Sequence, residues 1–179
     1  MPNNMGAHLA PLVEALVKRG GQIEAEDISK LTDAISQHLH VNPDEVAILV
    51  LVQRGHFLQF VYPERLQGVG TIPLTSTSAL AARTARDKRS EINNNFVIAR
   101  HASVFEAVPL DDKRVKPIQK IMSVPILLNS NVVGVLQASR KGMTQAAAGA
   151  DFTPLDLSKL VEAAAQIAPC IQLLQVKKP

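Results

Sequence analysis

Residues 123–141, SVPILLNSNVVGVLQASRK, decide the fold that this sequence predicts. They contain two apolar runs, 124–128 and 132–138, separated by the polar residues 129–131. Because Asn tolerates the left-handed backbone of a tight hairpin turn, the pattern predicts two adjacent antiparallel strands. The second run is apolar at nearly every position, which indicates a strand covered on both faces in the middle of its sheet. Gly134 lies in that run, and its missing side chain lets another element approach closely.

The residues that follow predict a long C-terminal helix. Thr153 can cap its start, Pro154 suits a first turn, and Asp156 lies at the capping-box offset. Apolar residues then recur at helical spacing over 154–175. Pro169 falls inside this pattern and removes a backbone donor, so we expect a kink or an early end there.

This hairpin and helix resemble the C-terminal half of a GAF domain. The resemblance implies an α+β, GAF/profilin-like fold with a central antiparallel sheet of about six strands, helices packed on its faces, and the first and last strands adjacent at the centre. GAF domains bind varied small molecules, so the fold does not identify a ligand. The residues that carry the resemblance are Val124, Pro125, Val133, Gly134, Val135, Leu136, Gln137, Lys141, Phe152, Thr153, Asp156, Leu160, Gln166, Ile167 and Ala168.

The earlier part of the chain supplies the other elements of such a domain. Apolar runs at 46–52 and 56–62 around an Arg-Gly turn predict a second hairpin. We expect helices at 8–19, 24–40 and 78–88, a short strand at 68–74, and an irregular segment at 91–117. The expected division is an N-terminal helical extension, residues 1–22, followed by a GAF domain, residues 23–176.

Composition excludes several classes of protein. The chain has 179 residues, 46% of them hydrophobic, which suits one sizeable core. No apolar run reaches the roughly 18–20 residues that span a bilayer, and we expect neither a secretory signal nor a membrane partner. A net charge of +3 with 3% aromatic residues argues against nucleic-acid binding. The single cysteine, Cys170, rules out an intrachain disulfide and is compatible with the cytoplasm, where we expect the protein.

Nothing in the sequence indicates catalysis or a metal site. His38 and His40 are two residues apart on a predicted helix, so they lack the spacing of a helical metal site. No nucleophile has a recognisable signature. One branch of the GAF family, free methionine sulfoxide reductase, uses several cysteines, whereas we expect Cys170 to pack as a small apolar residue. We therefore predict that the protein is not an enzyme and has no catalytic residues. The cofactor is unknown.

The irregular middle of the chain is where the resemblance implies a ligand. Residues 83–120 hold nine basic and five acidic residues, which favours an anionic ligand, although charge runs are more often the solvated face of a helix. The Asn triplet and Phe96 only partly match the motif of cyclic-nucleotide-binding relatives, because its Lys and Asp-Glu are missing. The candidate ligand-binding residues are Asn93, Asn94, Asn95, Arg100, His101 and Phe105. The alternatives are turn formation by the asparagines and ordinary loop packing by His101 and Phe105.

These patterns predict a sensory or regulatory GAF domain that binds an unidentified small molecule non-covalently and signals through dimer or partner contacts. The alternative is a non-catalytic dimerisation or interaction module with a vestigial pocket. Terminal helices of many GAF proteins pair across a two-fold axis, so the resemblance implies a homodimer. The competing possibility is that the first helix folds back on its own domain.

Overall fold

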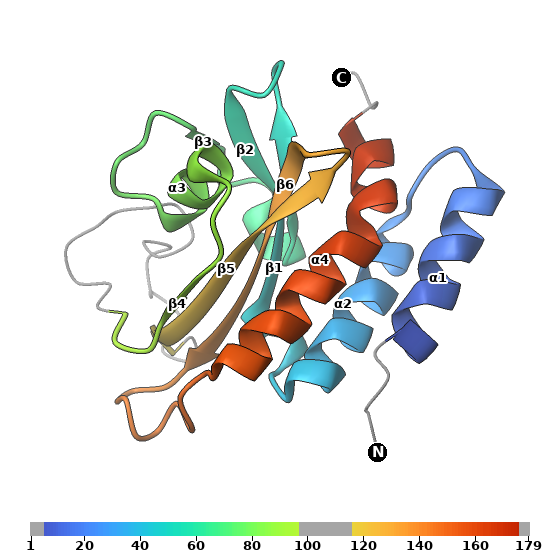
Figure 1. Ribbon diagram of the computed structural model, residues 1–179. Helices are drawn as coiled ribbons and strands as arrows, with labels where there is room; N and C mark the ends of the chain where they lie inside the picture. The colour runs from blue at the N-terminus through green and yellow to red at the C-terminus, as the bar shows by residue number, and fades with distance from the viewer. Residues whose placement is uncertain (1–5, 97–115, 176–179) are drawn as a thin grey trace.

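The computed structural model describes residues 6–96 and 116–175, and a six-stranded antiparallel sheet forms its centre (Figure 1). The strands are ordered β3-β2-β1-β6-β5-β4. The number of strands and the α+β class agree with the prediction. The strands are β1 (Val46–Val52), β2 (Phe57–Tyr62), β3 (Thr71–Pro73), β4 (Glu91–Asn93), β5 (Ile118–Leu128) and β6 (Asn131–Lys141).

The hairpin predicted at residues 123–141 is formed by β5 and β6. Leu128 pairs with Asn131, and the turn residues between them, Asn129 and Ser130, have φ angles of 50° and 66°. These positive values fit a two-residue hairpin turn whose central residues are both left-handed. β5 begins at Ile118, six residues before its predicted start. The prediction relied on a continuous apolar run, and the residues IQKIMS mix polar and apolar side chains, so they were not included.

The predicted adjacency of the first and last strands is confirmed. β1 pairs with β6 in a register that places Ile48 opposite Leu136 and Val50 opposite Gly134. A Cβ atom at Gly134 would collide with the backbone carbonyl oxygen of Leu49. The missing side chain therefore lets β1 and β6 pair closely at the centre of the sheet, as the sequence indicated.

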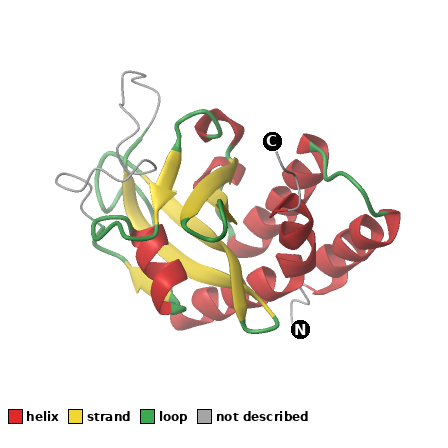
Figure 2. Cartoon of the chain, turned by 90° about the horizontal axis from the view of Figure 1, so that it is seen from above, coloured by secondary structure: helices red, strands yellow, loops and turns green. Residues whose placement is uncertain are grey.

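Helices cover both faces of the sheet unequally. Figure 2 shows the three long helices gathered on one side of the strands. Two of them, α2 (Ala25–Leu39) and α4 (Pro154–Gln175), pack on that face, and α1 (Gly6–Arg19) packs against both as an outer layer. The short helix α3 (Leu80–Asp87) covers the opposite face, and two 3-10 turns, η1 (Pro43–Glu45) and η2 (Glu64–Leu66), complete the described elements.

Two helices differ from the sequence predictions at their prolines. α1 begins at Gly6 and not at the predicted residue 8, so Pro11 lies beyond its first turn. α4 runs through Pro169 to Gln175, so it does not end early. Packing against the sheet and α1 supplies the free energy that keeps a helix intact across one missing hydrogen bond. The cap of α4 is as predicted, since the carboxylate of Asp156 accepts the N–H of Thr153 at 2.8 Å.

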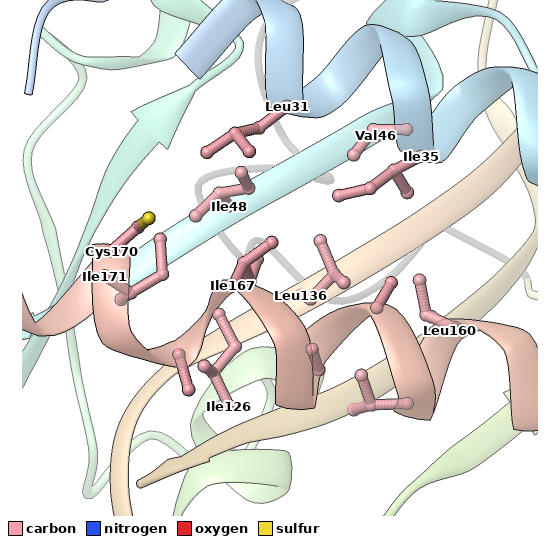
Figure 3. Close-up of a cluster of buried hydrophobic side chains, with 14 of the residues drawn as sticks. Leu31, Ile35, Val46, Ile48, Ile126, Leu136, Leu160, Ile167, Cys170 and Ile171 are labelled. Atoms are coloured by element: carbon pink, nitrogen blue, oxygen red, sulfur yellow. The ribbon is translucent and has the colours of Figure 1, made fainter. Parts of the chain in front are cut away.

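The main hydrophobic core lies between the sheet and α1, α2 and α4 (Figure 3). Ile48, Ile126 and Leu136 of the sheet lie opposite Ile35 of α2 and Ile167 of α4, and none of the five is exposed. Each such side chain contributes about 1.5–3 kcal/mol relative to an exposed one. A second cluster on the other face joins α3 to the sheet. None of the described helices is long and apolar enough to cross a membrane.

A candidate ligand site between α3 and β4

A chain of buried hydrogen bonds joins α3 to the sheet. The hydroxyl of Thr84 on α3 donates to the carbonyl of Leu80 at 2.9 Å and lies 2.7 Å from the hydroxyl of Ser123 on β5. The amide of Gln137 on β6 donates to Ser123 Oγ at 3.1 Å. Because the one proton of Thr84 goes to Leu80, Ser123 donates to Thr84. Thr84, Ser123 and Gln137 are all buried, so this chain fixes the position of α3 on the sheet.

A cavity of about 360 Å³ lies beside this network. Such a volume is at the small end of the range for ligand pockets. α3 supplies one wall and the edge strand β4 with the residues before it supplies the other. The lining is mostly polar and consists of Arg83, Thr84, Asp87, Arg89, Ser90, Glu91 and Ile92.

The basic residues around the cavity differ in how far they are already paired. The guanidinium of Arg83 lies 2.5 Å from the carboxylate of Glu91, and both residues line the cavity. Arg86 donates to the carbonyls of Leu74 and Ser76, and Lys88 donates to the carbonyl of Ser130. These three side chains are exposed and hydrogen-bonded.

Arg89 differs from Arg83 in having no partner in the described part of the chain. Within residues 6–96 and 116–175 it has no hydrogen-bond or ion-pair partner, and it lines the cavity together with Ser90. A guanidinium presents several donors in a planar arrangement that suits carboxylate or phosphate. Lys120, which belongs to the same basic region of the sequence, is buried instead, where it donates to the carbonyl of Gly149 at 2.6 Å and to Asp151 at 2.7 Å.

The predicted asparagines lie at and just after the end of β4, beyond Ile92, and none of them lines the cavity. Asn93 Oδ1 accepts the N–H of Asn95 at 3.0 Å, which is the turn interaction that the sequence also allowed. The amide of Asn94 makes two hydrogen bonds to the backbone of Phe152 at the start of α4. The other three candidates, Arg100, His101 and Phe105, lie outside the described residues.

The sequence did not single out the buried network of this site. Thr84, Ser123 and Gln137 come from separate parts of the chain, and Ser123 and Gln137 are directly opposed only because of the hairpin register. The sequence did contain one sign of this network, because polar residues at 137 and 139 interrupt an otherwise apolar strand. On a strand covered on both faces, such residues require buried hydrogen-bond partners.

Cys170 lies on the other side of the sheet, away from this cavity. Its thiol is buried between α4 and α1, 3.9 Å from the carbonyl oxygen of Val13. Burial raises the pKa of the Cys170 thiol to about 11. It packs as a small apolar residue, as the sequence predicted. The described part of the chain holds no group of three or more His, Cys, Asp or Glu side chains placed to bind a metal ion.

A second hollow, an apolar groove of about 510 Å³, separates the outer surfaces of α1 and α4. On α1, Leu9, Val13 and Leu16 are buried, so the inner face of this helix is covered by its own chain. Val17 remains 44% exposed beside the groove, and Val161 on α4 is 43% exposed. The carbonyl oxygen of the Gln166 side chain, at the groove, is buried without a hydrogen-bond partner among the described residues.

Comparisons with known proteins identify the fold. No family model and no curated protein matches the chain. Among solved structures, the GAF domain of a phosphoenolpyruvate-protein phosphotransferase from Acinetobacter matches with a TM-score of 0.65 and 16% identity, over 99% of each chain. Residues 122 to 287 of a methyl-accepting chemotaxis protein match with a TM-score of 0.62 and 14% identity, over 93% of this chain and 99% of that one.

A third similar structure is an enzyme, the type II free methionine-R-sulfoxide reductase from Thermoplasma acidophilum. It matches with a TM-score of 0.53 and 15% identity, over 87% of this chain and 100% of that one. At such identities the likeness concerns the backbone arrangement and not the chemistry. The six-stranded order and the nearly complete coverage agree with what the C-terminal motif indicated. The chain has the fold of GAF domains.

Proposed function

We propose that this protein is a sensory or regulatory GAF domain that binds a small anionic or zwitterionic molecule non-covalently in the cavity between α3 and β4. The observation that carries the proposal is the guanidinium of Arg89, which has no partner among the described residues and lines a polar cavity whose other arginine is already bonded to Glu91. A ligand carboxylate or phosphate would accept from Arg89, and the Ser90 hydroxyl would add a neutral contact. Asn93, Asn94 and Asn95 are proposed to border the site.

The output of such a domain is proposed to pass through α1 and α4, in a homodimer or in contact with a partner. Support comes from two exposed apolar residues on these helices, Val17, which lines the groove, and Val161 elsewhere on α4. The ion pair of Glu14 and Lys18 at this surface is exposed, so a second copy could exchange its members across a two-fold axis. We keep the cytoplasm as the predicted location.

The same surface supports the alternative, an interaction module in which the cavity is vestigial. In that case the protein would dimerise or bind a partner equally well without any ligand. Catalysis is not part of either proposal. A cysteine-based reduction would need an accessible thiolate, whereas the thiol of Cys170 is buried and has a raised pKa.

The first test is mass spectrometry of the purified full chain, native and then denatured. A dimer that carries a reproducible mass under native conditions and loses it on denaturation would support a non-covalent sensor. A dimer with no added mass would favour the interaction module. A monomer would contradict the pairing of α1 and α4 between copies.

The second test examines the site directly, by thermal shift against a panel of carboxylates, phosphates and amino acids. Arg89→Ala should abolish any stabilisation found, because it removes the guanidinium that would hold the ligand. Lys30→Ala removes one positive charge from α2, on the opposite side of the sheet, and should leave the stabilisation unchanged. Equal losses in both variants, or a ligand whose effect survives Arg89→Ala, would place binding elsewhere.

A further inference from the structure

We propose that Asn94 transmits changes at the cavity between α3 and β4 to the start of α4. The inference rests on the proposed function, because the cavity is the ligand site only if that proposal holds. It concerns how occupancy of the cavity would reach the helix surface on the other side of the sheet.

The first step is the bond between Asn94 and Phe152, which are 58 residues apart in the chain. Asn94 Nδ2 donates to the carbonyl of Phe152 at 3.0 Å, and the N–H of Phe152 donates to Asn94 Oδ1 at 2.8 Å. A side-chain amide that both donates to and accepts from one residue acts as a peptide group does in a paired strand. Both hydrogen bonds are partly buried, so water competes with them only weakly.

The second step is the connection from Asn94 to the cavity. β4 ends one residue before Asn94, and its first residue, Glu91, forms the ion pair with Arg83 in the cavity lining. β4 is a three-residue edge strand that pairs only with β5, from Glu91 opposite Ser123 to Asn93 opposite Ile121, in the described part of the chain. A strand with so few ladder bonds is displaced more easily than the central strands. A ligand held by Arg89 that also accepts from Arg83 would displace Glu91 and would therefore shift β4 and, with it, Asn94.

The third step is the connection from Phe152 to α4. Phe152 lies two residues before Pro154, the first residue of the helix, and its ring is buried in the main core under the guanidinium of Arg140, 4.5 Å from the ring centre. Thr153, the next residue, bonds Asp156 in the first turn. A displacement of Phe152 therefore acts on the cap of α4 and on the core beneath it.

α4 then carries the change to α1. The helix continues to Gln175 and packs against α1, with Cys170 near Val13. Asn95 makes a separate contact with the loop before α4, since Gln145 Nε2 lies 3.4 Å from Asn95 Oδ1, and this contact does not involve Phe152. Asn94 is thus a positioning residue, and its bonds join the end of β4 directly to the residue that precedes the cap of α4.

The experiment is a double-mutant cycle read by amide hydrogen exchange, and it needs no ligand. Glu91→Gln weakens the ion pair with Arg83 at the cavity wall, and Asn94→Ala removes the bridge. In the native background, Glu91→Gln should speed exchange at Phe152 and in the first turn of α4 several-fold. In the Asn94→Ala background, where Phe152 already exchanges about tenfold faster, Glu91→Gln should add nothing.

Two controls separate coupling from simple capping. Asn95→Ala should leave the response to Glu91→Gln intact, since Asn95 makes no bond to Phe152 in the described residues. Asn94→Asp keeps the acceptor for the Phe152 N–H, so it should retain part of the response. The proposal is overturned if Glu91→Gln leaves α4 unchanged, or changes it equally with and without Asn94. Either result would leave the ligand proposal standing, because that proposal is tested by Arg89→Ala.

Discussion

Arg19 and Asp27 form the ion pair that fixes α1 to α2. The guanidinium of Arg19, the last residue of α1, donates to both carboxylate oxygens of Asp27, at 3.3 and 2.6 Å. The nearer oxygen also accepts the backbone N–H of Glu24 at 2.8 Å. One carboxylate therefore caps α2 and holds α1 in place, which explains why an acidic residue is almost fully buried beside an exposed helix end.

We expect stability to depend on the ionisation of Asp27. The hydrogen bond from Arg19, followed by the one from the Glu24 N–H, holds the pKa of Asp27 below its ordinary 3.8. Because the folded pKa is the lower one, the stabilisation is present above the unfolded value and is lost as the pH falls through the folded value. Asp27→Asn should cost about 1–2 kcal/mol at pH 7 and flatten the acid limb of the stability curve, as measured by urea unfolding.

The matched control for this prediction is Glu26→Gln on the same turn of α2. Glu26 is exposed and forms an exposed ion pair with Lys30, so its replacement should change stability little at any pH. If the free energy of unfolding fell with decreasing pH equally in the native protein and in Asp27→Asn, the loss of stability in acid would not come from Asp27.

Cys170 should be nearly inert in the folded protein. A pKa raised from 9.0 to about 11 leaves roughly a hundredfold less thiolate near pH 8, and burial under α1 blocks access as well. We expect a thiol reagent such as 5,5′-dithiobis(2-nitrobenzoate) to react slowly with the native protein and rapidly in urea. Because the chain has one cysteine, the absorbance change reports this site alone. Fast labelling without denaturant would mean that α1 does not cover α4 in solution.

Gly134→Ala should destabilise the protein severely, by about 3 kcal/mol or more. The new methyl group would meet the carbonyl oxygen of Leu49, which is backbone in the central strand β1 and has no space into which to move. Thermal or urea unfolding measures the loss. Gly68→Ala is the control, since a Cβ atom there would meet no described atom within 4 Å and the change should stay within about 0.5 kcal/mol. A mild effect at Gly134 would contradict the β1–β6 register.

Ser123→Ala should weaken the attachment of α3 to the sheet. It removes the acceptor of Gln137 and the donor to Thr84, and it leaves both groups buried, at an expected cost of about 1–3 kcal/mol. Ser29→Ala, an exposed serine on α2, serves as the control in urea unfolding. If the two variants were equally stable, the hydrogen-bonded chain from Leu80 to Gln137 would contribute no net stability.

The hairpin of β5 and β6 and the cap of α4 were predictable because their causes are local. A left-handed turn at Asn129 and a Thr153–Asp156 cap depend on residues a few positions apart. β4 was missed for the opposite reason. Its three residues are too few to show a period, and they form a strand only because β5 offers them a free edge.

The GAF-type arrangement was implied by the family resemblance, and apolar periodicity added which faces of each strand and helix must be buried. Periodicity does not identify the element that packs against each buried face, and α1 is an example. Its stripe of Leu9, Val13 and Leu16 was compatible with a partner helix, yet it packs on α2 and α4 of its own chain. Folding in three dimensions was needed to place Asn94 against Phe152, since a hydrogen bond between residues 58 apart exists only after the chain has folded.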